Sequence, residues 1–435
     1  MILVYCSTIT ARKEYIFKHI FKRLMKQEFS FTTDLSAFVG HSGIKFSYGE
    51  KPVGDEYFVY AHGLLDEHGI DDHDTDMISW GELPAFFPAP ESSHLPFDLF
   101  SASFYLLTRY EEYLPQVNDQ LGRYDANESL AAKAGFLELP LVDLWVKAFR
   151  LDLIAYFEVD LTVNQRPHTT VCVEVSSFFK FRNRGVIENL SMFWHNLKKF
   201  RLSKLLTQIA VLMRVRQDPY MNYDDLIQML KHSWKGSRKP VGSTLDMLFF
   251  FHLGNYNRVD NGTSHRIRSY REGIKHIADY VDIGLRYSFF AGQKQIEREG
   301  KRFENLANRP LKKTMSAFSK IAMPGHYKRL VETEKIEDYS MGYETIPGFR
   351  ASTCNPFYFY DLDYEVQTPL LVFPYALHYK SIEGHMLNGQ SHMLQRLKSQ
   401  VRNVSGQFIV MFEYGQFDKR LKSHIYTILQ DIYEE

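Results

Sequence analysis

EDYSMGYETIPGFRASTCNPFYFYDL, residues 337–362, joins a strand-like run, a turn, one arginine and a row of aromatic side chains. Proline followed by glycine at Pro347-Gly348 favours a type II turn, because glycine adopts a positive φ at little cost. Arg350 comes next between apolar neighbours, where a guanidinium needs an acidic partner or a ligand. Asn355-Pro356 then requires an extended backbone. We therefore expect a strand end that opens into the wall of a pocket.

The composition indicates a soluble globular protein of two domains. The chain has 435 residues, 45% hydrophobic and 24% charged, which is too long for one ordinary core. The formal net charge is zero, so no overall field attracts nucleic acid. The first residues lack the pattern of a signal peptide, and no apolar run has the length of a membrane span. The cysteines Cys6, Cys172 and Cys354 show no metal or redox spacing. We expect a cytoplasmic protein with reduced thiols.

Two kinds of pattern divide the chain near residues 159–168, where periodicity is lost. Before this boundary we expect helices over residues 95–114 and 141–157. After it, nearly continuous apolar runs alternate with helical ones, which predicts a parallel sheet covered on both faces. The expected strands are 171–175, 247–253, 280–285, a run near 315–321, 338–343, 369–377 and 408–414. This pattern alone fits a doubly wound sheet or a barrel.

Residues 342–362 and 95–114 carry a resemblance to the polysaccharide deacetylase-like family, the NodB-homology carbohydrate esterases. The resemblance is to a Bacteroidetes-type branch with an additional N-terminal domain. It implies an incomplete (β/α) barrel over residues 169–435, preceded by a smaller α/β accessory domain over residues 1–160. Ligands would then bind at the carboxyl ends of the barrel strands.

The resemblance also implies where a catalytic site would lie. Family deacetylases use a divalent metal that activates water, with carboxylate and imidazole groups that move protons. In this chain the base aspartate corresponds to Glu174 and a metal-binding aspartate to Ser176. The metal-binding histidine corresponds to Arg286, with Ser288 beside it, and the late histidine to Glu413. A guanidinium cannot ligate a metal. We therefore expect the metal site of the family to be lost, leaving the protein without a cofactor.

Residues elsewhere in the chain do not rebuild a catalytic site in sequence. Cys172 and Cys354 have no obvious histidine partner, and a buried cysteine is usually inert. The remaining histidines lack the paired spacing of a metal site; they are His252, His326, His378 and His385.

We expect a non-catalytic member of the family that binds a glycan, or acts as a scaffold or regulator, in surface-polysaccharide metabolism. Its partner would be a glycan or lipid-linked saccharide, bound through Arg350, Tyr358 and Tyr360, and no protein partner is indicated. The aromatic residues 357–360 should divide between core and pocket rim, because successive strand residues face opposite ways. An alternative is an active deacetylase or hydrolase that acts without metal, with Glu174 and Glu413 as its acid–base pair.

Residues 178–216 are strongly basic and allow two interpretations. Nine Lys and Arg residues accompany a single acid, Glu188, among many apolar residues. Such a segment could contact anionic lipid or lipopolysaccharide at a membrane surface. The interpretation that we favour is a pair of helices that covers the sheet and turns its basic side to solvent.

Arg286 should replace the missing metal charge. Without a cation, carboxylates at the strand ends would repel one another and destabilise the fold. We predict that Arg286 forms a salt bridge with Glu174, Glu413 or both. A fixed positive charge there would also keep both acids ionised and so oppose the acid–base alternative.

Overall fold

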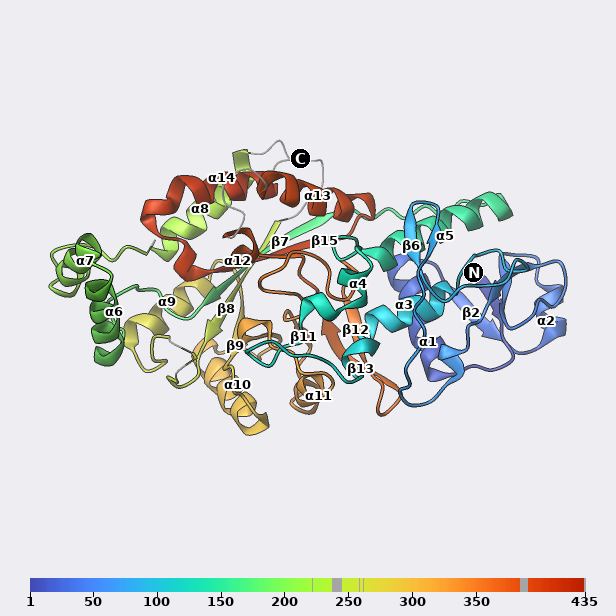
Figure 1. Ribbon diagram of the computed structural model, residues 1–435, viewed down its shortest axis with the longest axis horizontal. Helices are drawn as coiled ribbons and strands as arrows, with labels where there is room; N and C mark the ends of the chain where they lie inside the picture. Colours follow the sequence, from blue (N-terminus) through green and yellow to red (C-terminus); the bar gives the residue numbers. More distant parts are fainter. Residues whose placement is uncertain (221, 237–244, 258, 261, 384–389, 434–435) are drawn as a thin grey trace.

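The computed structural model describes residues 1–220, 222–236, 245–257, 259–260, 262–383 and 390–433, so His385 lies outside the described residues. Two larger sheets, a two-stranded sheet and the helices around them form an elongated molecule, with the N-terminal residues toward one end (Figure 1). No described helix combines the length and apolar character needed to cross a bilayer.

The N-terminal sheet has the order β2-β1-β3-β4, and all its pairs are parallel. Thr10 caps the first helix by accepting a hydrogen bond from Lys13 N at 3.2 Å. A short antiparallel pair and several helices complete this part. The strands are β1 Ile2–Tyr5, β2 Phe29–Thr32, β3 Lys45–Gly49, β4 Tyr57–Tyr60, β5 Ile78–Trp80 and β6 Leu83–Ala85. The helices are α1 Ala11–Phe17 with its π-helical continuation Lys18–Leu24, α2 Leu35–Gly40, α3 Leu99–Leu107, α4 Leu130–Lys133 and α5 Leu141–Phe157.

The helix expected over residues 95–114 is shorter in the structure, whereas the expected 141–157 helix is α5. Helix α3 begins after Asp98, whose buried carboxylate accepts hydrogen bonds from Phe100 N and Ser101 N, both at 3.0 Å. It ends before Arg109, whose φ of +56° is left-handed and therefore not helical. A 3-10 turn, Tyr110–Glu112, follows.

The C-terminal sheet has nine strands in the order β12-β13-β11-β10-β9-β8-β7-β15-β14. All neighbouring strands are parallel except β12 and β13. The large parallel sheet expected after residue 169 is therefore confirmed. Its strands are β7 His168–Val175, β8 Leu245–His252, β9 Asp282–Tyr287, β10 Lys313–Ser316, β11 Glu337–Asp338, β12 Phe357–Asp361, β13 Val366–Val372, β14 Leu377–His378 and β15 Gln407–Glu413.

Both faces of this sheet are buried, as the apolar runs predict. Alternate residues such as Val171 and Val173 join the main core, together with the apolar stripes of the surrounding helices. The opposite face forms a separate apolar cluster of Cys172, Leu248, Phe250, Met315, Tyr339, Tyr375, Ile409 and Met411. The helices of this part are α6 Val186–Lys198, α7 Leu202–Leu212, α8 Tyr223–Gly236, α9 Arg268–Ala278, α10 Gln293–Ala307, α11 Gly325–Glu332, α12 Tyr379–Glu383, α13 Gln390–Asn403 and α14 Lys422–Tyr433.

Two expected strands differ because the chain changes partners. The run 338–343 contributes only Asp338 to a strand, the two-residue β11, and the run 369–377 is divided between β13 and β14. Between them, Phe373 N donates to Asp338 O at 2.8 Å, whereas Ala376 N donates to Ile409 O at 3.1 Å. Pro374, which has no N–H, lies where the chain passes from one neighbour to the other.

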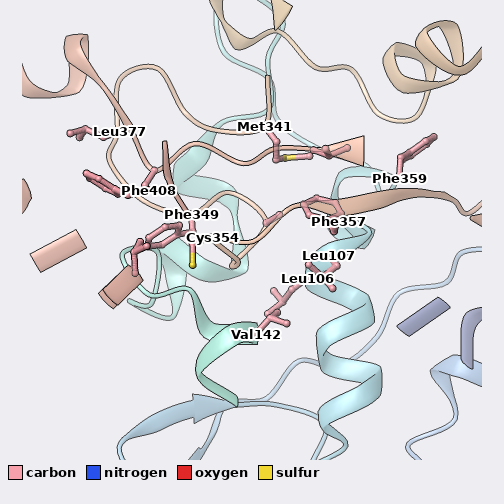
Figure 2. Packing of buried hydrophobic residues seen from close by; sticks show 14 of the residues in the cluster. Leu106, Leu107, Val142, Met341, Phe349, Cys354, Phe357, Phe359, Leu377 and Phe408 are labelled. Atoms are coloured by element: carbon pink, nitrogen blue, oxygen red, sulfur yellow. The ribbon is translucent and has the colours of Figure 1, made fainter. Parts of the chain in front are cut away.

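The N-terminal part packs against the C-terminal sheet through a continuous apolar core. In Figure 2, Leu106 and Leu107 of α3 and Val142 of α5 lie in the same packed cluster as Phe357 and Cys354. A loop that contains a positive-φ glycine completes this contact. Gly348 has φ +138°, and a Cβ at this position would lie 2.5 Å from the carbonyl oxygen of Leu137. Only glycine permits this close approach.

Candidate functional site

The candidate site lies at the edge of the C-terminal sheet where the parallel strands end. Glu174 of β7 is opposite Glu413 of β15 in the register, and His252 of β8 is opposite Arg286 of β9. Because parallel strands end at the same edge, these polar side chains gather above the apolar cluster of the inner face. Carboxylates on adjacent strands repel, so the site needs positive charge.

Arg286 supplies the first positive charge. Only 4% of its surface is exposed, and its Nε donates to Glu174 Oε2 at 2.8 Å. One of its terminal nitrogens donates to Asp260 Oδ1 at 3.2 Å. Burial alone would lower the pKa of Arg286, but Glu174 and Asp260 outweigh it and raise the pKa. The predicted salt bridge between Arg286 and Glu174 is confirmed.

Glu413 takes a different partner, Lys380 of α12. The Lys380 ammonium lies 2.5 Å from Glu413 Oε1 and 2.6 Å from Glu344 Oε1. Arg123, from the N-terminal part, lies 2.7 Å from the second oxygen of Glu344. Burial opposes the charge on Lys380, but Glu413 and Glu344 raise its pKa. A direct pair between Arg286 and Glu413, the other predicted contact, is replaced by this lysine.

Two histidines adjoin these ion pairs. His252 Nδ1 lies 3.4 Å from a terminal nitrogen of Arg286, and burial together with that guanidinium lowers the His252 pKa to about 4. His378 is fully buried, and its Nδ1 accepts a hydrogen bond from Lys380 N at 3.2 Å. The other ring nitrogen of His378, Nε2, lies 3.6 Å from Glu174 Oε1. Burial raises the Glu174 pKa, but His378 and Arg286 outweigh it and lower the pKa overall.

One group of side chains has the composition of a metal site. Glu344, His378 and Glu413 each offer a ligand atom, and these atoms lie within 4.8 Å of one another. The Lys380 ammonium, however, contacts both carboxylates. One ring nitrogen of His378 already accepts a hydrogen bond from Lys380 N, and the other lies beside Glu174. The residues as arranged do not fit a divalent metal.

An aromatic side chain in a strained backbone conformation covers the ion pairs. Phe318 follows β10 with φ +56°, which is uncommon for a bulky residue and often marks a functional position. Its ring centroid lies 5.3 Å from Arg286 Cζ and 5.1 Å from Lys380 Nζ. Phe289 stands edge-on to it at 5.7 Å, and Phe290 beside Phe289 is 68% exposed. The rings of Phe318, Phe289 and Phe290 thus form an apolar rim beside the ion pairs of Arg286 and Lys380.

A small pocket opens next to this rim, between residues 119–127 and 342–346. Its volume is about 120 Å³, and its lining includes Tyr124, Tyr343, Arg123 and Glu344. Arg123 also donates to the carbonyl oxygen of Phe318 at 2.8 Å. The N-terminal part thus contributes one wall of the pocket and ties that wall to the strand ends.

Arg350 has an acidic partner, Glu112, in place of a ligand. It is 1% exposed, and its Nε and terminal nitrogen donate to the two oxygens of Glu112 at 2.9 and 2.6 Å. Arg109 donates to the same carboxylate at 2.8 Å. Arg350 therefore forms a buried link between the two parts of the chain, and it also belongs to the lining of the pocket beside the rim.

Tyr358 and Tyr360 contact the N-terminal part and not the strand-end site. The Tyr360 hydroxyl donates to Glu365 Oε2 at 3.0 Å, and its ring packs on Tyr15 at 4.9 Å. The half-buried ring of Tyr358 lies under the Arg23 guanidinium at 4.8 Å. This placement follows from β12, an antiparallel edge strand that the sequence did not indicate. Phe357, Phe359 and Tyr360 are all buried, so the expected division between core and pocket rim is not found.

The two serines of the predicted site have local partners. Ser288 Oγ donates to Glu299, which also accepts from Ser288 N at 3.0 Å. The carbonyl oxygen of Ser176 accepts from Thr263 N at 2.8 Å. The three cysteines are buried and free, and burial raises the pKa of Cys172 and of Cys354. Such thiols are poor nucleophiles.

Sequence reasoning missed Asp260, Glu344, Lys380 and Phe318, which all come from loops or from a short helix after a strand. His252 and His378 were considered only as possible metal ligands, and their spacing gave no reason to join them. The available signal was their position, since each directly ends an apolar strand run. Polar residues at that position in parallel strands share one edge.

Comparisons with known proteins cover the chain incompletely. Residues 2–158, which end one residue after α5, match the model of a family of unknown function, DUF7033. No curated protein matches the chain significantly. The chain is similar to a solved structure described as "Crystal structure of putative polysaccharide deacetylase from Mycobacterium smegmatis". That similarity spans 63% of this chain and 88% of the other, with 12% identity and a TM-score of 0.37, which does not establish a common fold.

Proposed function

We propose that this chain is a polysaccharide deacetylase-like protein that binds a saccharide at the strand ends without catalysing deacetylation. It would act as a glycan-binding, scaffold or regulatory component in surface-polysaccharide metabolism. The observation that carries the proposal is the ion pair of Arg286 with Glu174, at 2.8 Å. A guanidinium there provides positive charge, but it can neither ligate a metal nor release a proton.

The protonation of the site supports a binding role over an acid–base role. Glu174 has a lowered pKa because His378 and Arg286 outweigh its burial, so it stays ionised and cannot act as a general acid. Glu413 is held by Lys380 at 2.5 Å. The proposed site therefore has no cofactor and depends on fixed charges from the protein itself.

The surface beside these charges suits a sugar. Binding pockets combine aromatic walls with a few well-placed polar groups. Phe318 and Phe289 provide rings, and the neighbouring 120 Å³ pocket adds Tyr124, Tyr343 and the Arg123–Glu344 pair. We propose that a glycan or lipid-linked saccharide packs on these rings, with the predicted residue Arg350 in the pocket lining and without the predicted contacts to Tyr358 and Tyr360.

We also propose that the C-terminal sheet is an incomplete (β/α) barrel and a separate domain, residues 169–435, after an accessory domain of residues 1–160. The consecutive strands β7 to β11 are neighbours, and β15 returns to pair with β7. Backbone hydrogen bonds of residues 373–376 link the β11 side to β15. The buried free cysteines favour a reducing, cytoplasmic location.

Titration calorimetry with N-acetylglucosamine oligomers tests the binding role. We expect binding that weakens about three- to ten-fold in Phe318→Ala and in Tyr124→Ala, because each removes one stacking surface. Tyr364→Ala is the matched control, since Tyr364 is an exposed aromatic residue that does not line the pocket. Absence of binding, or equal loss in all three variants, would contradict the proposal.

Acetate release from the same oligomers, with and without added Zn²⁺, separates binding from catalysis. We expect no release above background under either condition. Release that is abolished by Glu174→Gln or Glu413→Gln would instead support the hydrolase alternative, in which these carboxylates act as an acid–base pair.

A further inference from the structure

A helical hairpin projects from the end of the molecule opposite the N-terminal part (Figure 1). It consists of α6 Val186–Lys198 and α7 Leu202–Leu212, inserted between β7 and α8. Leu205, Gln208 and Val211 are buried, and Gln208 Nε2 donates to Asn189 O of α6 at 2.8 Å. One side of each helix is thus used within the hairpin itself. The hairpin does not cover the sheet, contrary to the interpretation favoured from the sequence.

The other side of the hairpin is apolar and exposed. On both helices these residues recur every three or four positions, which places them on one face. At the tip, Phe200 is 86% exposed and has φ +50°. The exposed apolar residues are Val186, Ile187, Leu190, Trp194, Leu197, Leu202, Leu206, Ile209, Leu212 and Met213. An exposed apolar face on each of two adjoining helices, with Phe200 at the turn between them, marks an interaction surface.

The charges around this face identify the kind of partner. Residues 178–216 contain nine Lys and Arg residues and one acid, while the whole chain is neutral, so the remainder of the chain is net negative. Lys198, Lys199 and Arg201 flank Phe200 at the exposed tip. A second copy of this chain would bring two basic hairpins together, which like-charge repulsion opposes. An anionic surface with an apolar interior satisfies both features.

We propose that the α6–α7 hairpin docks on an anionic lipid membrane. Its apolar face enters the boundary between headgroups and acyl chains, and its lysines and arginines contact the lipid headgroups. A groove of about 310 Å³ lies beside this face, lined by Phe181, Met192, His195 and Lys204 among others. The proposal does not depend on saccharide binding.

Vesicle sedimentation tests the proposal with the full chain. We expect binding to vesicles of phosphatidylcholine mixed with phosphatidylglycerol, little binding to phosphatidylcholine alone, and weaker binding as salt increases. Lys198→Gln and Lys199→Gln should each weaken binding about five-fold. Phe200→Ser and Leu206→Ser should weaken it at every salt concentration. All four side chains are exposed, so thermal unfolding should not change.

Lys294→Gln and Lys301→Gln on α10 are the matched controls, because they remove exposed lysines from a helix without an exposed apolar face. Equal binding to neutral vesicles, no binding to either kind, or equal loss in the controls would overturn the proposal. Sedimentation equilibrium provides a further check. Self-association without lipid that Leu206→Ser abolishes would assign the face to a second copy and also overturn it.

Discussion

Glu174 and Glu413 are opposite each other on adjacent parallel strands, yet each carboxylate contacts a different cation. Arg286 reaches Glu174 at 2.8 Å from β9, and Lys380 reaches Glu413 at 2.5 Å from α12. Two acids in register would otherwise repel each other. The negative and positive charges at this edge of the sheet therefore balance in a network of ion pairs. Loss of one cation should lower the stability of the fold.

Arg286→Met should lower the free energy of unfolding by about 3–5 kcal/mol, because it leaves Glu174 and Asp260 buried without their cation. Urea unfolding measures this change. The double variant Arg286→Met/Glu174→Gln should lose less, since the uncompensated charge is reduced. Arg396→Met, which removes an exposed partner of Glu138, is the control and should have little effect. A similar small effect in both single variants would contradict the prediction.

Arg350→Met should destabilise the protein by about 1.5–3 kcal/mol, because the buried Glu112 would lose its two hydrogen bonds from Arg350 and keep only Arg109 as a cation. Replacement of both residues by methionine should recover part of this loss. Since the pair joins the two parts of the chain, the single variant should also be cleaved faster by protease within residues 159–167. Unchanged cleavage together with full stability would show that the pair contributes nothing.

Asp338 should make stability depend on pH in the direction opposite to a salt-bridged acid. Burial raises its pKa from 3.8 to about 7, so the folded protein retains a proton that the unfolded chain loses. Stability from this group is present below pH 3.8 and is lost as pH rises toward 7, by roughly 4 kcal/mol in total. Asp338→Asn should remove this slope in urea unfolding, whereas Asp279→Asn at an exposed position should retain it. Parallel pH profiles for Asp338→Asn and the unchanged protein would contradict the assignment.

Gly348→Ala should destabilise the protein by about 2–4 kcal/mol. Its φ of +138° is nearly confined to glycine, and the added Cβ would lie 2.5 Å from the Leu137 carbonyl oxygen. Gly292→Ala is the matched control, because its φ is −77° and a Cβ would meet no atom within 4 Å. The midpoint of thermal unfolding measures both. Equal midpoints would show that the loop can move away from Leu137.

The sequence predicts those elements whose own apolar pattern reflects burial. The runs of β7, β8 and β15 are apolar on both faces because helices and an inner cluster cover them, so the parallel sheet could be predicted. The pairing of Arg286 with Glu174 could be predicted because a buried guanidinium needs an acid. Lys380 could not, since it lies on a five-residue helix with no periodicity to indicate its direction.

The position of Arg350 shows a second limit of local patterns. The sequence indicated that it needs an acid or a ligand, but not which, because Glu112 is 238 residues away along the chain. Likewise, β12 carries an aromatic run that suits a pocket rim as well as a packed interface. Its antiparallel pairing with β13 turns that run toward the N-terminal part.

The return of β15 to β7 has a consequence for biosynthesis. A ribosome releases the chain from its N-terminus, and β7 is complete long before residues 407–413 are made. Until then, one hydrogen-bonding edge of β7 has no neighbour, and an unpaired apolar strand edge promotes aggregation. Completion of the sheet therefore waits for nearly the whole chain, so premature termination anywhere before β15 should yield an insoluble product, and nascent chains of this protein should engage chaperones for an unusually long time.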